Sequence, residues 1–67
     1  MSVLVWLSLH AKEQARERGV TIAEIKQAIQ MGAKHTQDDK IVADYGYIRV
    51  VYRMVGSAPY VITVMIR

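Results

Sequence analysis

The chain has 67 residues, of which 52% are hydrophobic, and its formal net charge is +3 at pH 7. This length allows one small domain, whose core alone rarely supplies more than about 3–5 kcal/mol of net stability. The sequence contains no cysteine, which excludes a disulfide framework and a thiolate zinc site. We therefore expect self-association or a permanent partner to add stability, and the mild basic charge is compatible with nucleic acid or an acidic protein.

The first predicted element is a short apolar strand over residues 3–7. It has no basic leading segment and is too short for a signal peptide or a membrane span, so we expect a cytosolic protein without a membrane partner. A charged helix follows, with Ser8 as its N-cap and Gly19 at its end. This helix offers a core only a narrow apolar stripe, which consists of Ala11 and Ala15.

A second helix is predicted to begin at a capping box and to end at Gly32. The capping box is Thr21 followed three residues later by Glu24. The apolar residues of this helix recur at helical spacing, and they are Ile22, Ile25, Ala28 and Ile29. We therefore expect the second helix, rather than the first, to supply most of the helical packing.

The polar segment over residues 33–40 is predicted to be a loop or a frayed strand edge. Asp38 and Asp39 suit a turn within it. His35 also lies in this segment, and no other residue stands at metal-ligand spacing from it. We interpret His35 as a structural or incidental residue.

The last third of the chain has the period of two that is typical of strands. Residues 47–55 form one predicted strand, residues 56–59 a turn and residues 60–67 the last strand. One face of the first of these strands carries Ile48, Val50, Tyr52 and Met54, and the other carries Tyr47, Arg49, Val51, Arg53 and Val55. We predict a single α+β domain over residues 1–67: a strand, two helices and a three-stranded antiparallel meander, with both helices packed on one face.

The register of the last hairpin follows from its apolar residues. The last strand is expected to place its richer apolar set under the helices, and this set is Ile62, Val64 and Ile66. The resulting register sets Arg49 near Arg67 on the other face. Because like charges across a sheet destabilise it, this pair requires an anion. The anion could be a carboxylate of this chain or a phosphate of a ligand, and both alternatives remain open.

Polar residues form a row on the first helix. His10, Gln14 and Arg18 follow one another at intervals of four residues beside the alanine stripe, and Glu17 lies on the other side of the row. A half-sheltered histidine with such neighbours can act as a general acid or base, and an arginine can stabilise a developing phosphorane charge. In the structural alternative, His10 is a polar bridge to the sheet edge and Arg18 pairs with Glu17 or a loop carbonyl.

Several catalytic signatures are missing from the sequence. It has no glycine-rich phosphate loop, no HExxH motif, no Cys/His cluster and no nucleophile elbow. We therefore expect no metal and no cofactor. Acid–base chemistry on a phosphodiester remains compatible with the chain, because it needs only basic and polar side chains.

Short pieces of the sequence resemble a bacterial family of domains of unknown function that is grouped with the RelE, ParE and BrnT toxins. The pieces are SLHAKEQARERGV, TIAEIKQAI, IRVVYRMVG and YVITV. The most specific part is His10-Ala11, followed by Glu17-Arg18-Gly19 ahead of the capped second helix. The resemblance extends over nearly the whole chain.

The resemblance implies a RelE-type fold and a metal-independent endoribonuclease that cleaves RNA through attack of the 2′-hydroxyl, with an antitoxin protein as its partner. The family's catalytic positions fall on His10, Glu17 and Arg18. RNA or anion binding is assigned to Gln14 and to the strand arginines Arg49, Arg53 and Arg67. The family usually has a basic residue where this chain has Gln14, which can hydrogen-bond a phosphate without neutralising it.

A second hypothesis is a non-catalytic interaction module of the same fold. The surplus of apolar residues and the presence of Gln14 motivate it. The exposed sheet face would then form a homo-oligomer, first of all a dimer, or bind a protein partner. The residues predicted for this interface are Val51, Val55, Val61 and Met65.

Overall fold

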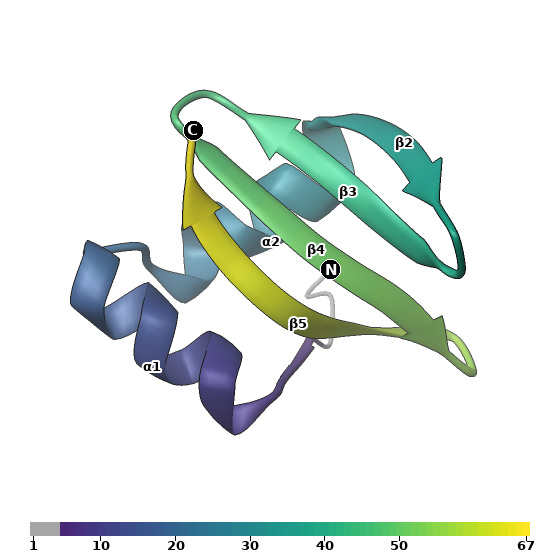
Figure 1. Cartoon of the computed structure of the whole chain (residues 1–67), viewed down its shortest axis with the longest axis horizontal. Helices are drawn as coiled ribbons and strands as arrows, with labels where there is room; N and C mark the ends of the chain where they lie inside the picture. Colours follow the sequence, from purple (N-terminus) through teal and green to yellow (C-terminus); the bar gives the residue numbers. More distant parts are fainter. Residues whose placement is uncertain (1–4) are drawn as a thin grey trace.

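A computed structural model describes residues 5–67, which form two helices and a five-stranded sheet. The elements are β1 (Trp6–Leu7), α1 (Leu9–Arg18), α2 (Ile22–Met31), β2 (Ala33–Gln37), β3 (Lys40–Tyr45), β4 (Ile48–Val55) and β5 (Ala58–Ile66). The sheet order is β1-β5-β4-β3-β2, in which β1 runs parallel to β5 and the other neighbours are antiparallel. Figure 1 shows α2 behind β4 and α1 alongside β5. The predicted α+β class is confirmed.

The sheet has more strands than the sequence predicts. Residues 33–37 form the edge strand β2, so the strand alternative for this segment holds and the loop alternative is wrong, and the turn at Asp38 and Asp39 is confirmed. The antiparallel meander therefore contains the four strands from β2 to β5, and β1 adds a parallel neighbour. Of the predicted first strand, Trp6 and Leu7 lie in β1, whereas residues 3 and 4 lie outside the described residues.

The two capping residues predicted for α1 define its ends. The Ser8 hydroxyl accepts a hydrogen bond from the Ala11 N–H at 3.0 Å. Gly19 ends the helix with φ at 69°, in the left-handed region that favours glycine. Ala11 and Ala15 are buried against the sheet, and the rest of the helix is half-buried or exposed. The narrow apolar stripe expected for this helix is thus confirmed.

The predicted capping box also begins α2. Glu24 Oε1 accepts from the Thr21 N–H at 2.9 Å, and the Glu24 N–H donates to Thr21 Oγ1 at 3.2 Å. The second carboxylate oxygen of Glu24 accepts from the Tyr47 hydroxyl at 2.6 Å. This bond, together with the cap, lowers the pKa of Glu24, and it raises the pKa of Tyr47. Glu24 therefore ties the start of α2 to the β3–β4 turn.

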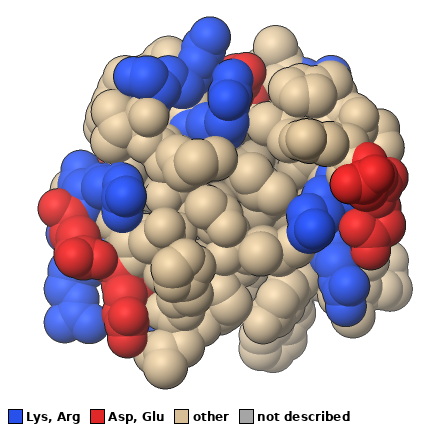
Figure 2. Space-filling model, in the orientation of Figure 1, with Lys and Arg blue, Asp and Glu red and all other residues tan. Residues whose placement is uncertain are grey.

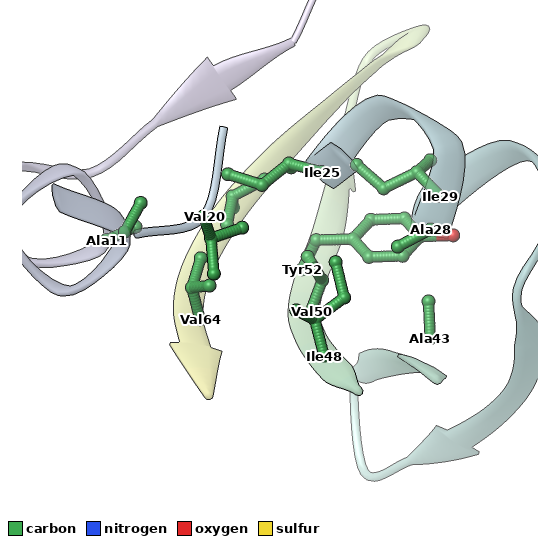
Figure 3. Packing of buried hydrophobic residues seen from close by; sticks show 12 residues of the cluster. Ala11, Val20, Ile25, Ala28, Ile29, Ala43, Ile48, Val50, Tyr52 and Val64 are labelled. Carbon is green, nitrogen blue, oxygen red and sulfur yellow. The ribbon is translucent and has the colours of Figure 1, made fainter. Parts of the chain in front are cut away.

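The core lies between the two helices and one face of the sheet (Figure 3). The helices contribute Ala11, Ala15, Ile25, Ala28 and Ile29, and the strands contribute Ala43, Ile48, Val50, Tyr52, Val61 and Val64. The predicted core face of β4 is confirmed except for Met54, which is exposed near the end of the strand. Ile22, which was expected to pack with the other isoleucines, is 48% exposed.

A β-bulge changes the register of the last hairpin. Val51 lies opposite Thr63, whereas the next residue, Tyr52, lies opposite Val61, so that Ile62 is an extra residue in β5. The bulge places both Val61 and Val64 in the core, where each is fully buried. The predicted turn over residues 56–59 is also too long, because β5 begins at Ala58, which pairs with Val55. The predicted register is therefore wrong, and so is the assignment of Val61 to an exposed interface.

Candidate functional site

The face of the sheet turned away from the helices is called the open face. Along β4, Arg49, Val51 and Arg53 alternate with the core residues of the strand and therefore lie on this face. The pairing registers extend the open face to Trp6, His35, Val42, Asp44, Tyr60, Thr63 and Met65. Figure 2 shows that the centre of this face is uncharged and that charged side chains lie around its margin.

The open face brings a histidine and two arginines to the same side of the sheet. His35 lies opposite Val42, and Val42 lies opposite Val51. Arg49 and Arg53 stand two residues before and after Val51, so their side chains flank this row. The sequence prediction missed His35 as a site residue because it left the segment open between a loop and a frayed strand edge and gave it no register with β3. The side chains of residues 33–37 are all exposed, so the sequence holds no apolar alternation that could have found it.

Arg49 on β4 and Asp44 on β3 form a bidentate ion pair. Arg49 Nε donates to Asp44 Oδ1 at 2.6 Å, and Arg49 Nη2 donates to Oδ2 at 3.1 Å. The hydrogen bond from Arg49 lowers the pKa of Asp44, and the nearby Arg67 and His35 side chains act in the same direction. The anion that Arg49 requires is thus supplied by this chain, although the Arg49 side chain remains 41% exposed.

The other two strand arginines are placed differently from each other. Arg53 Nη1 lies 3.9 Å from Asp39 Oδ2, and both side chains are largely exposed, so this ion pair is weak. Arg67 Nη1 donates to the Gly46 carbonyl at 3.2 Å, at the β3–β4 turn. Arg67 does not lie opposite Arg49, because the short turn that pairs Val55 with Ala58, together with the bulge, places Met65 there. Arg53 is therefore the strand arginine whose guanidinium is most open to a ligand.

Gln14 closes the outer edge of the sheet. Its side-chain oxygen accepts a hydrogen bond from the Val64 N–H at 3.1 Å. Ser8 completes the same edge, because its hydroxyl donates to the Ile62 carbonyl at 3.3 Å and its N–H donates to the Val61 carbonyl at 3.0 Å. The carbonyl of Gln14 thus takes the place of a neighbouring strand, and only its amide N–H groups are left for an anion.

We expect replacement of Gln14 by alanine to lower the free energy of unfolding by about 1–2 kcal/mol, because the partly buried Val64 N–H loses its acceptor. Urea denaturation followed by circular dichroism measures this change. The matched control is Gln27→Ala, since Gln27 is exposed on α2. Equal stability of the two variants would show that the hydrogen bond to β5 contributes nothing.

The remaining residues of the α1 row do not converge on one point. His10, Glu17 and Arg18 are all exposed, and the rise of an α-helix separates His10 from Arg18 by about 12 Å. They belong to the helix layer, whereas Arg49 and Arg53 lie on the open face. A shallow hollow on α1 is lined by Glu13, Arg16 and Glu17 and includes neither His10 nor Arg18. The structure therefore separates the helix row from the strand arginines.

Residues 5–67 contain no group of three or more His, Asp or Glu side chains placed to hold a metal ion. Neither helix in this part of the chain is long and apolar enough to cross a membrane. The histidines and arginines of the open face and of the α1 row are therefore the candidate residues for a functional site.

These features define a small α+β domain with one open sheet face that carries basic and aromatic residues. The chain belongs to the family described as "Domain of unknown function (DUF4258)", whose family model matches residues 7–66. That range includes both helices and all five strands, except for Trp6, the first residue of β1. Neither the curated proteins nor the solved structures gave a significant match. The relationship to the RelE, ParE and BrnT toxins stays a prediction.

Proposed function

We propose that this chain is a metal-independent endoribonuclease-type toxin domain of a bacterial toxin–antitoxin pair, and that its open face binds the RNA. The observation that carries the proposal is the presence of His35, Arg49 and Arg53 on one face of the sheet, around the row formed by Val42 and Val51. A phosphate above this row would be within the range of long arginine side chains from both sides. An imidazole and two guanidinium groups are sufficient for acid–base cleavage of RNA.

The cleavage step assigns a task to each of these groups. The His35 imidazole takes the proton of the 2′-hydroxyl, and the 2′-oxygen forms a bond to phosphorus as the bond to the 5′-oxygen breaks. The imidazolium returns the proton to the leaving 5′-oxygen, so the products are a 2′,3′-cyclic phosphate and a 5′-hydroxyl. Arg53 stabilises the charge that develops on the phosphorane oxygens, and Arg49, whose Nε and Nη2 are bound to Asp44, contributes its remaining N–H groups.

The test is cleavage of a labelled single-stranded RNA in the presence of EDTA, with the two histidines of the chain replaced one at a time. We expect His35→Ala to slow cleavage about a hundredfold or more, because it removes the acid–base group, and His10→Ala to retain most of the activity. Circular dichroism checks that both variants remain folded.

The outcomes separate the two candidate sites. Loss of cleavage only in His10→Ala would place catalysis on α1, as the resemblance implies, and would remove His35 from the mechanism. A folded wild-type protein that leaves the RNA intact would overturn the ribonuclease proposal itself. The proposal includes the cytosol as the compartment, where RNA is found, and an antitoxin protein as the partner.

A second candidate function is a homo-oligomeric interaction module that uses the same face. The uncharged centre of the open face favours it (Figure 2), and the residues concerned are Val51, Val55 and Met65. Light scattering at micromolar concentration should then show a dimer, and Met65→Lys should dissociate it by placing a charge in the interface. A monomeric wild-type protein would exclude this candidate.

A further inference from the structure

Three side chains form a row across β1, β5 and β4 on the open face. Trp6 is paired with Tyr60, and Tyr60 is paired with Arg53. Trp6 stands between Val5 and Leu7, which both pack against the core, so its own side chain is turned to the open face. Tyr60 reaches the same face because its two neighbours along β5, Pro59 and Val61, are buried. The three residues are called the aromatic row.

The aromatic row is accessible to a ligand. Trp6 is 55% exposed, Tyr60 is 36% exposed, and the Arg53 side chain is 53% exposed. Neighbouring strands lie about 4.8 Å apart, so the two rings and the guanidinium are adjacent. The only acidic partner of Arg53 among residues 5–67 is the weakly bound Asp39. The row therefore offers flat apolar surfaces directly beside an available positive charge.

We propose that the aromatic row stacks the bases of single-stranded RNA, and that Arg53 contacts the phosphate next to them. The proposal rests on the proposed function, from which it takes RNA as the ligand. Bases stack on aromatic side chains whatever their sequence, and an arginine beside the rings contributes both charge and cation–π attraction. A purely apolar partner would match the rings but leave Arg53 with only the weakly bound Asp39 as its counterion. The net charge of +3 also favours a polyanion.

Trp6 provides a direct readout, because it is the only tryptophan of the chain. The experiment titrates the protein with a short 2′-O-methyl oligouridylate, which keeps bases and phosphates but has no free 2′-hydroxyl to be cleaved. We expect saturable quenching of the Trp6 fluorescence as bases stack on the ring. Inorganic polyphosphate serves as a control that carries the charge without bases, and we expect it to cause no comparable quenching.

Substitution of Tyr60 tests whether stacking contributes to binding. We expect Tyr60→Leu to raise the dissociation constant for the oligouridylate about tenfold, whereas Tyr60→Phe, which keeps the ring, should bind as the wild type does. Arg53→Gln should weaken binding and also reduce its dependence on salt concentration, because one phosphate contact is lost. Circular dichroism of each variant checks that the fold is kept.

Four results would overturn the inference. The first three are an unchanged Trp6 signal on titration, equal quenching by polyphosphate, and equal affinity of Tyr60→Leu and Tyr60→Phe. A fluorescence change that follows protein concentration without any RNA would also overturn it and would assign the row to contacts between copies. Quenching that depends on Tyr60, in a protein that cleaves no RNA, would leave the inference standing and remove the ribonuclease function.

Discussion

Replacement of Gly32 by alanine is expected to lower the free energy of unfolding by about 3 kcal/mol, a large fraction of the stability of so small a domain. A Cβ atom at this position would lie 2.5 Å from the Ala28 carbonyl oxygen and 2.8 Å from the Asp44 carbonyl oxygen. Both contacts are with backbone atoms, which cannot rotate away as a flexible side chain could. Gly32 has φ at −70°, so lack of space rather than backbone conformation requires glycine.

The matched control for this prediction is Gly19→Ala. Gly19 has a positive φ of 69°, but a Cβ atom there would meet no heavy atom within 4 Å. We therefore expect a cost of about 1 kcal/mol, which comes from the backbone conformation alone. Urea denaturation of both variants measures the difference. If Gly32→Ala is no less stable than Gly19→Ala, the close approach of α2 to β3 is wrong.

A second large effect is expected for Ile25→Ala, which should lower the free energy of unfolding by about 3 kcal/mol. Ile25 is fully buried between α2 and the sheet, so truncation removes apolar contacts and leaves a cavity (Figure 3). The experiment compares this variant with Ile22→Ala, which makes the same chemical change one turn earlier in the helix.

Ile22→Ala should cost less than about 1 kcal/mol, because the Ile22 side chain is 48% exposed and alanine has the better helix propensity. The comparison tests which isoleucines of α2 form the core, since the spacing of the sequence alone treats them as equivalent. Similar losses of stability in the two variants would contradict the orientation of α2 on the sheet.

The helices and the central strands could be predicted because their signals are local. A capping side chain lies within one turn of the backbone group it binds, as Ser8, Thr21 and Glu24 do. Strand β2 could be predicted only as one of two alternatives, a loop or a frayed strand edge, because an edge strand whose side chains are all exposed has no apolar alternation. The bulge at Ile62 could not be predicted either, because the alternating residues of β5 fit two registers. The observed register includes a hydrogen bond from Ser8, which is distant in the sequence, to the Ile62 carbonyl.

The candidate site was only partly predictable, because some of its residues are brought together by pairing between strands and not by local sequence signals. The sequence identified Arg49 and Arg53 as neighbours on one face, because alternation within a single strand is sufficient for that. It left the anion of Arg49 open, because the pairing with Asp44 depends on the register between two strands. The placement of His35 beside these arginines depends on the register of a third strand, β2, which the sequence left open as a loop or a frayed strand edge.

The two edges of the sheet differ in a way that limits how this protein can polymerise. The outer backbone of β5 is occupied by β1, Ser8 and Gln14 from Tyr60 to Val64, whereas β2, among residues 5–67, has a neighbour only on its β3 side. A strand from another molecule can therefore add at β2 without displacing part of the fold, but not along that stretch of β5. Two copies joined through β2 would present outward their β5 edges, which are blocked from Tyr60 to Val64. Such strand addition ends at a closed pair and does not propagate into a fibre.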